Sequence, residues 1–188
     1  MGARHGLNRE VVIDTAEALV DRDGWTRLTM TDLAHKLGVR GPSLYSHVDS
    51  LEALLCEIQV RALRTLSTRL QRAAVGKAGA RCFQDLANEL RAFALEHPGR
   101  YDLAMSEAID PARMLQAGEP AAAALKAVIE SFGVDDPAFE LQLTCFAALH
   151  GVIALERTRL FAGAADVSKL YSRATAMVIL MLETEGGT

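Results

Sequence analysis

The chain of 188 residues lacks most features that mark membrane-bound, secreted or metal-binding proteins. Only 5% of its residues are aromatic, and it has five prolines and three cysteines. No apolar run approaches the roughly 20 residues that a helix needs to cross a bilayer, so we expect no membrane span. The N-terminal segment MGARHGLNREVV has no apolar core of the kind found in a signal peptide. The sequence therefore predicts a cytoplasmic protein.

Motifs for catalysis and for metal binding are also missing. The sequence has no Gly-rich phosphate loop, no recognisable pair of catalytic carboxylates and no spacing typical of a nucleophile with its base, so we do not expect an enzyme. Cys56, Cys82 and Cys145 are odd in number and lack the spacing of a metal site. We predict reduced, partly buried thiols, with redox sensing as the alternative. No metal or cofactor is expected.

The charge balance argues against a generic nucleic-acid binder, because such proteins usually carry a basic surface. The net charge is −4, and residues 1–50 hold six basic and seven acidic side chains. However, Glu10, Asp14, Glu17 and Asp21 are spaced 4, 3 and 4 residues apart, so they share one face of a helix. We expect this face to point into solvent, away from DNA. The basic side chains that would then remain near phosphates are Arg4, Arg9, Lys36 and Arg40.

The informative part of the chain is residues 28–55, which read LTMTDLAHKLGVRGPSLYSHVDSLEALL. Thr29 is a good helix N-cap, and Asp32 three residues later completes a capping pattern. Gly38 suits the left-handed conformation that ends a helix. Gly41 and Pro42 mark the start of a second helix, which we expect to cover residues 41–48.

The second of these helices has two different faces. Leu44 and Val48 are four residues apart and are expected to pack inward. The side chains between them are short or planar hydrogen-bonding groups, which suit base edges and phosphates in a major groove. Asn8 and Gly24 bracket an earlier helix, so three helices fill roughly residues 8–48. Asp49 and Glu52 are a candidate cap pair for the next helix at about Leu51.

The pattern LTMTDLAHKLGV-x-x-P-S-LY-x-H-V resembles the helix-turn-helix of the TetR family of bacterial repressors. The resemblance implies an all-α fold of about nine helices. Residues 1–50 would form a three-helix DNA-binding head, and residues 51–188 a helical ligand-binding and dimerisation domain. The positions expected to contact DNA are Thr31, Arg40, Gly41, Pro42, Ser43, Tyr45, Ser46 and His47. Arg40 stands where relatives often carry a small capping residue, and Leu51 where many carry a phosphate-binding lysine.

Helical patterns continue through the second domain. They cover residues 51–73, residues 83–94 up to His97-Pro98-Gly99, and residues 121–132, with a loop or frayed turn expected over residues 111–120. The last two, residues 138–161 and the stripe from Leu170 to Met181, carry more apolar surface than a small monomer can cover. Pairing with a second copy as a four-helix bundle would bury it.

His150-Gly151 and the segment HPGRYDLAM are similar to the Trp-His-Gly type of C-terminal domain in one TetR subgroup, with Leu149 in place of the tryptophan. A cavity for a largely apolar effector is one reading of the apolar and aromatic residues here, and ordinary core packing is the other. The candidate residues are Phe83, Leu86, Leu90, Phe93, Tyr101, Met105, Phe146 and His150.

The function that this resemblance implies is a ligand-responsive repressor. A homodimer would place its two heads about one DNA turn (~34 Å) or somewhat more apart on a pseudo-palindromic operator. A small, largely apolar effector would lower its DNA affinity. The alternative is a helical dimer that binds a ligand or a protein but not DNA, which the acidic head and Leu51 favour.

Overall fold

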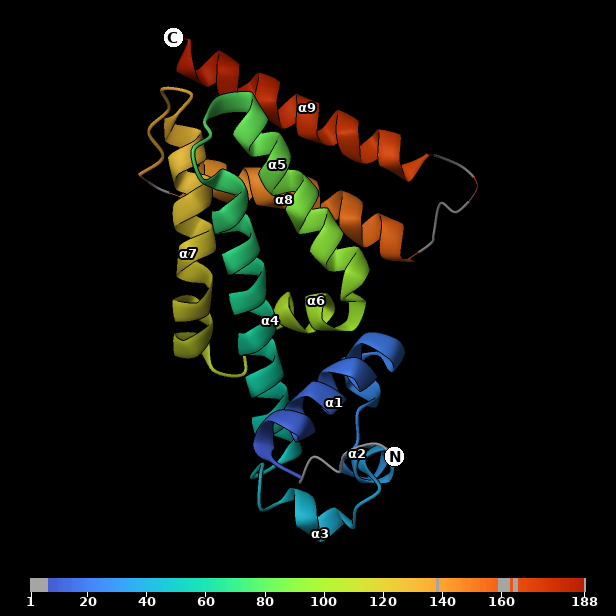
Figure 1. Cartoon of the computed structure of the whole chain (residues 1–188). Helices are drawn as coiled ribbons and strands as arrows, with labels where there is room; N and C mark the ends of the chain where they lie inside the picture. Colours follow the sequence, from blue (N-terminus) through green and yellow to red (C-terminus); the bar gives the residue numbers. More distant parts are fainter. Residues whose placement is uncertain (1–6, 138, 159–162, 164–165, 188) are drawn as a thin grey trace. The chain divides into compact units, whose positions relative to one another are not determined.

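Nine α-helices and one 3₁₀ turn make up the part of the chain that this computed structural model describes, which is residues 7–137, 139–158, 163 and 166–187 (Figure 1). No strand occurs in these residues, so the predicted all-α fold is confirmed. The chain divides into two compact units. The first contains Met1–Thr65 and Glu96–Ala117, and the second contains Leu66–Leu95 and Gly118–Thr188.

The first unit begins with the three expected helices, α1 (Arg9–Asp23), α2 (Met30–Leu37) and α3 (Gly41–Leu44), with the 3₁₀ turn η1 (Trp25–Arg27) after α1. The predicted helix starts are confirmed, because Asn8 Oδ1 accepts a hydrogen bond from the amide of Val11 and Thr29 Oγ1 accepts one from Asp32. Gly38 has φ 68°, the left-handed conformation predicted for a helix end. The next helix, α4 (Leu51–Ala74), is capped by Ser50 and not by Asp49, because the Ser50 hydroxyl accepts from the amide of Ala53 at 3.0 Å.

Helix α3 is shorter than the predicted helix over residues 41–48. It ends at Leu44, and a turn follows in which Tyr45 has φ −70° and ψ −9°. The Ser46 hydroxyl donates to the Ser43 carbonyl at 2.8 Å, so a serine side chain takes a carbonyl that a longer helix would use. The packing prediction is nevertheless correct, because Leu44 and Val48 are both buried.

One apolar core holds this unit together and includes residues far apart in the sequence. Leu103 from α6 (Pro98–Ala104) is fully buried in the same cluster as the side chains of the helix-turn-helix. Trp25 packs against this cluster while partly exposed. The buried members from α1, α2, α3 and α4 include Val12, Ile13, Ala16, Val20, Leu33, Leu44, Leu54 and Ile58. Helix α6 is therefore part of the core on which the helix-turn-helix is built.

The loop or frayed turn predicted for residues 111–120 is wrong, because this segment forms the first half of helix α7 (Pro111–Glu130). Asp110 caps it, because its carboxylate accepts from the amide of Arg113 at 3.1 Å. Met114 and Ala117 then bury against Cys56 and Val60 of α4. Proline and glycine in this stretch suggested a loop, but a proline in the first turn costs no hydrogen bond. Burial of Met114 and Ala117 offsets the one hydrogen bond that Pro120 removes inside the helix.

The second unit contains α5 (Gly79–Glu96), α8 (Glu140–Thr158) and α9 (Val167–Gly186), and α8 and α9 lie side by side (Figure 1). Polar contacts join α5 to both. The Tyr171 hydroxyl of α9 donates to the Ala87 carbonyl at 2.6 Å, and Arg91 pairs with Glu156 of α8 at 2.7 Å. The predicted helix over residues 138–161 matches α8 between Glu140 and Thr158. Residues 138 and 159–161 lie outside the described part.

The three cysteines are buried and form no disulfide. Burial raises the pKa of the Cys82 thiol, and it raises the pKa of the Cys145 thiol to about 11. Both thiols are therefore protonated at neutral pH, and it is the thiolate that reacts with oxidants. Among the described residues, no helix is long and apolar enough to cross a membrane.

Candidate nucleic-acid interface

The residues predicted to contact DNA lie on the outer side of α2, α3 and the following turn. Thr31 is in the first turn of α2, which packs against α3. Arg40 precedes α3, and Tyr45 and His47 follow it. Buried Leu44 and Val48 fix the orientation of this short segment, so its remaining side chains face outward. The exposed members of the set are Thr31, Arg40, Pro42, Ser43, Tyr45 and Ser46, and Gly41 and His47 are half-buried.

This surface offers hydrogen-bonding groups and one cation. Tyr45 keeps 55% of its surface exposed, which is unusual for an aromatic side chain in a packed unit. Arg40 is exposed and makes no side-chain hydrogen bond to the helix that it precedes. Among the described residues, no group of His, Cys, Asp and Glu side chains is placed to hold a metal ion. The groups on this surface are suited to recognition by hydrogen bonds, charge and shape.

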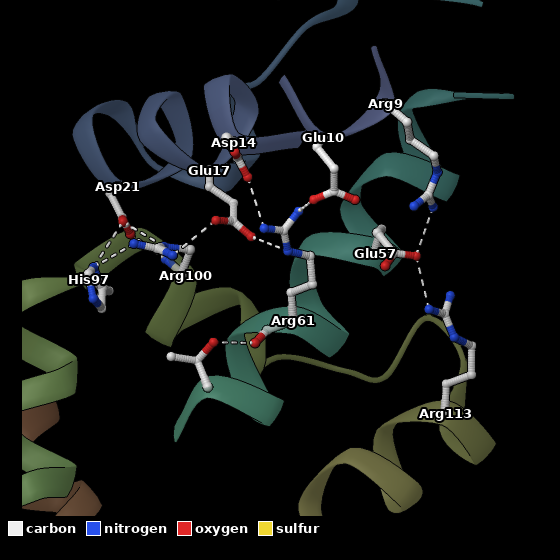
Figure 2. A network of polar contacts seen from close by, with 11 residues as sticks. Arg9, Glu10, Asp14, Glu17, Asp21, Glu57, Arg61, His97, Arg100 and Arg113 are labelled. Atoms are coloured by element: carbon white, nitrogen blue, oxygen red, sulfur yellow. Dashed lines mark hydrogen bonds and ion pairs between the residues drawn. The ribbon is translucent and has the colours of Figure 1, made fainter. Parts of the chain in front are cut away.

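The acidic face of α1 is only partly solvent-exposed, which corrects half of the sequence-based expectation: Glu10 and Asp14 are exposed, whereas Glu17 is buried and Asp21 is half-buried. Arg61 of α4 pairs with Glu10 at 3.2 Å, with Asp14 at 2.9 Å and with Glu17 at 3.2 Å (Figure 2). Arg100 of α6 then pairs with the other oxygen of Glu17 at 3.0 Å and with Asp21 at 2.7 Å. Two arginines from outside residues 1–50 thus neutralise part of the acidic face.

Glu17 is the centre of this arrangement, because its carboxylate contacts both arginines (Figure 2). Only 8% of the residue is exposed. Burial raises the pKa of Glu17 above its ordinary value, although Arg61 and Arg100 act in the opposite direction. A buried carboxylate of this kind is stable only while its cationic partners are in place.

A second ion-pair centre lies on the same unit. Glu57 of α4 contacts Arg9 of α1 at 3.0 Å and Arg113 of α7 at 2.9 Å (Figure 2). Arg9 was expected to be available for phosphates, and the structure instead pairs it with this carboxylate. Arg4 lies outside the described residues. Lys36 and Arg40 are exposed, as expected.

These ion pairs change how much the acidic residues among residues 1–50 contribute to the surface charge. Five of the seven carboxylates in this range lie in ion pairs, because Asp23 also pairs with Arg22. A paired carboxylate contributes less to the long-range field than a free one, so Arg61 and Arg100 reduce the field of the acidic α1 face. Sequence reasoning missed Arg61, Arg100 and Glu57. The regular spacing of the α1 carboxylates was the signal that cationic partners existed, but not where they lay.

The candidate effector residues fall into both compact units. Phe83, Leu86, Leu90 and Phe93 of α5 are buried in the second unit, where Phe146 and His150 of α8 stack with ring centroids 5.3 Å apart. Tyr101 and Met105 belong to the first unit, and Tyr101 is 1% exposed. Burial is expected of a core residue and of a cavity-lining residue alike, so the effector role of these eight residues stays a prediction.

Comparison with protein families gives a match over half of the chain. The family described as the tetracyclin repressor-like C-terminal domain matches residues 83–178. The uncharacterized HTH-type transcriptional regulator Rv0681 of Mycobacterium tuberculosis is 39% identical over 155 residues, which is 81% of this chain and 71% of that protein. The class D tetracycline repressor of Escherichia coli is 47% identical over 57 residues, 30% of this chain and 26% of the repressor.

Solved structures agree on the fold. The TetR family protein ActR of Streptomyces coelicolor, in complex with actinorhodin, aligns with a TM-score of 0.67 at 19% sequence identity. The alignment covers 97% of this chain and all of that one. At this identity the likeness shows a shared fold alone.

Proposed function

This chain belongs to the TetR family of transcriptional regulators, and from that premise we propose that it is a ligand-responsive repressor that binds a pseudo-palindromic operator as a homodimer. The observation that carries the proposal is the outward row of hydrogen-bonding residues around α3, held by buried Leu44 and Val48. Residues 1–50 would form the DNA-binding domain, and residues 51–188 the domain for effector binding and dimerisation. Such a regulator acts in the cytoplasm and has no need of a catalytic site.

DNA recognition would combine base and backbone contacts. Helix α3 would enter the major groove, where Pro42 meets a thymine methyl group and Arg40 reaches a guanine or a phosphate. Tyr45 and His47 would bind phosphates, which set the register of the helix without reading sequence. Thr31, Gly41, Ser43 and Ser46 complete the surface. The ion pairing of the acidic α1 face weakens one of the two arguments for a helical dimer without DNA binding, the acidic head. The other argument, Leu51 in place of a phosphate-binding lysine, is unaffected.

Dimerisation is supported by an apolar surface on α8 and α9. Leu143 is 53% exposed, Met177 72% and Leu180 63%. Gly151 lies on the same face of α8, and a Cβ atom there would meet nothing of this chain within 4 Å. A glycine inside a helix costs about 1 kcal/mol relative to alanine, and close approach of a partner helix would explain it. Two copies would bury this surface as a four-helix bundle.

Induction would follow from differential binding. A small, largely apolar effector that prefers a head arrangement unsuited to the operator lowers DNA affinity by that preference. The apolar residues of α5 and the Phe146–His150 pair of α8 are the groups that we propose for this contact. ActR, a protein of the same fold, has been solved with actinorhodin bound.

The experiment is a gel-shift titration with the DNA upstream of the chain's own gene and with selected genomic fragments. We expect Tyr45→Ala and Arg40→Ala to weaken binding by about 5- to 150-fold, and Arg40→Ala to lower the salt slope by about one if Arg40 contacts a phosphate. Arg81→Ala is the matched control, because Arg81 is an exposed arginine of α5 in the other compact unit. Failure of the wild-type protein to shift any fragment at low salt would overturn the proposal.

A further inference from the structure

We propose that helix α6 is part of the DNA-binding module, and that Arg61 and Arg100 are positioning residues that fix α1, α4 and α6 as one rigid body. The role in operator binding rests on the function proposed above, whereas the rigid body does not. The inference rests on three separate sets of polar contacts, one between each pair of these helices, and each set is called a joint below. Each joint lies within the first compact unit.

The first joint holds α1 on α4. The Arg61 guanidinium contacts Glu10, Asp14 and Glu17, which lie on successive turns of α1 (Figure 2). The Arg61 side chain therefore contacts residues that span about two turns of α1. Apolar packing between two helices tolerates sliding, but a planar guanidinium with three carboxylate partners has one favourable position along the axis.

The second joint holds α1 on α6. The backbone amide of Arg100 donates to Asp21 Oδ1 at 2.9 Å, and its Nε donates to Oδ2 of the same carboxylate at 2.7 Å. Its Nη1 also donates to Glu17 at 3.0 Å. The backbones touch beside these bonds, because a Cβ atom on Gly99 would lie 1.8 Å from the Val20 carbonyl oxygen. Neither helix has room to shift toward the other.

The third joint holds α4 on α6 and the segment after it. Gln59 is fully buried, and its Nε2 donates to the carbonyls of Leu103 at 2.9 Å and Glu107 at 3.0 Å. Its Oε1 accepts from the amide of Ile109 at 3.1 Å. An amide that satisfies three backbone groups far away in the sequence fixes the position of that backbone, because losing any of these bonds leaves a buried polar group unpaired.

Three helices joined pairwise form a closed triangle, so none moves without the others. A displacement of α6 is then a displacement of α1 and of the helix-turn-helix that α1 supports. The proposed DNA contacts all lie in residues 1–50, but the rigid module that carries them extends beyond residue 50. It includes α4 up to Thr65 and the segment Glu96–Ala117.

Hydrogen exchange on the full chain tests the rigid body without DNA. Amides of α1, of α4 up to Thr65 and of α6 should open with one common free energy, and Arg100→Met should raise exchange in α1 and α6 together. Arg91→Met is the matched control, since it breaks the Arg91–Glu156 pair of the second unit and should leave α1 and α6 unchanged. Two results would overturn the proposal. One is that the amides of α6 open with the free energy of α5 and not with that of α1. The other is that Arg100→Met raises exchange in α6 while α1 stays protected.

Operator spacing tests the positioning role. On the wild-type operator we expect Arg61→Met and Arg100→Met to lose about tenfold in affinity. Their ability to discriminate against operators with one base pair added or removed between half-sites should fall as well. A residue that merely stabilises the fold would lower affinity for every spacing by one factor, and that result would contradict positioning. If the wild-type protein binds no DNA, the proposed function fails, but hydrogen exchange still tests whether α1, α4 and α6 form one rigid body.

Discussion

Replacing Gly99 with alanine tests how tightly α6 is held on α1. The added Cβ atom would lie 1.8 Å from the carbonyl oxygen of Val20 and 2.4 Å from its carbonyl carbon. Such atoms do not approach closer than about 3.0 Å, so the two backbones must separate by about 1.2 Å. This shift also lengthens the bonds from Arg100 to Asp21 and Glu17, which are 2.7–3.0 Å in the native arrangement.

The two effects add. Overpacking of this size costs about 1–3 kcal/mol, and weakening hydrogen bonds to charged groups adds about 1 kcal/mol or more, so we expect a loss of about 3 kcal/mol in unfolding free energy. For a chain of this length that corresponds to a melting temperature lower by about 6–12 °C. The assay is urea and thermal unfolding by circular dichroism at one fixed protein concentration, because the proposed dimerisation would make stability depend on concentration.

Gly41→Ala is the control for the loss of glycine itself. A Cβ atom at Gly41 meets nothing within 4 Å, and this glycine also lies in the first turn of a helix. We expect its unfolding free energy to stay within about 0.5 kcal/mol of the wild type. Equal stability of Gly99→Ala and Gly41→Ala would refute the close α1–α6 contact.

Three further predictions follow from burial and charge. Burial raises the pKa of Glu57, but hydrogen bonds from Arg113 and Arg9 lower it by more, so its stabilising effect is present above pH ~4.5 and is lost as the pH falls through the lowered pKa. Glu57→Gln should therefore cost about 1–3 kcal/mol at pH 7 and progressively less as the pH falls below about 4.5 in urea titrations, and a pH-independent difference would contradict this. Met177→Glu should shift the protein toward monomer in analytical ultracentrifugation, because Met177 is 72% exposed on the proposed interface; an unchanged sedimentation coefficient would place the interface elsewhere. The buried Cys145 thiol, whose pKa is about 11, should resist modification in the native protein, and rapid alkylation at pH 7.5 would refute its burial.

Local signals in the sequence predicted local structure well. Asn8, Thr29 and Gly38 mark helix ends because capping depends on groups within three or four residues. The inward positions of Leu44 and Val48 followed from helical spacing. The length of α3 could not be predicted in this way. The Ser46 hydroxyl competes with the backbone for the Ser43 carbonyl, and helix propensity alone does not say which of the two forms the hydrogen bond.

Contacts between distant segments were beyond sequence reasoning. Prolines at 111 and 120 suggested a loop, yet Met114 and Ala117 find partners on α4 and make the segment helical. The acidic face of α1 looked like a solvated surface because its partners, Arg61 and Arg100, lie about 50 and 80 residues away. The eight candidate DNA contacts were proposed from a family resemblance, and six of them are exposed in the structure while Gly41 and His47 are half-buried.

The central claim is that two copies of this chain read a symmetric DNA site. Selection of bound fragments from genomic DNA, followed by footprinting of the enriched sequence, tests it most directly. The account predicts a pseudo-palindrome whose two protected half-sites are centred about one helical turn (~34 Å) or somewhat more apart, with protection lost in Tyr45→Ala. Enrichment of no sequence over bulk DNA, or a single unpaired site with unchanged protection in Tyr45→Ala, would contradict it.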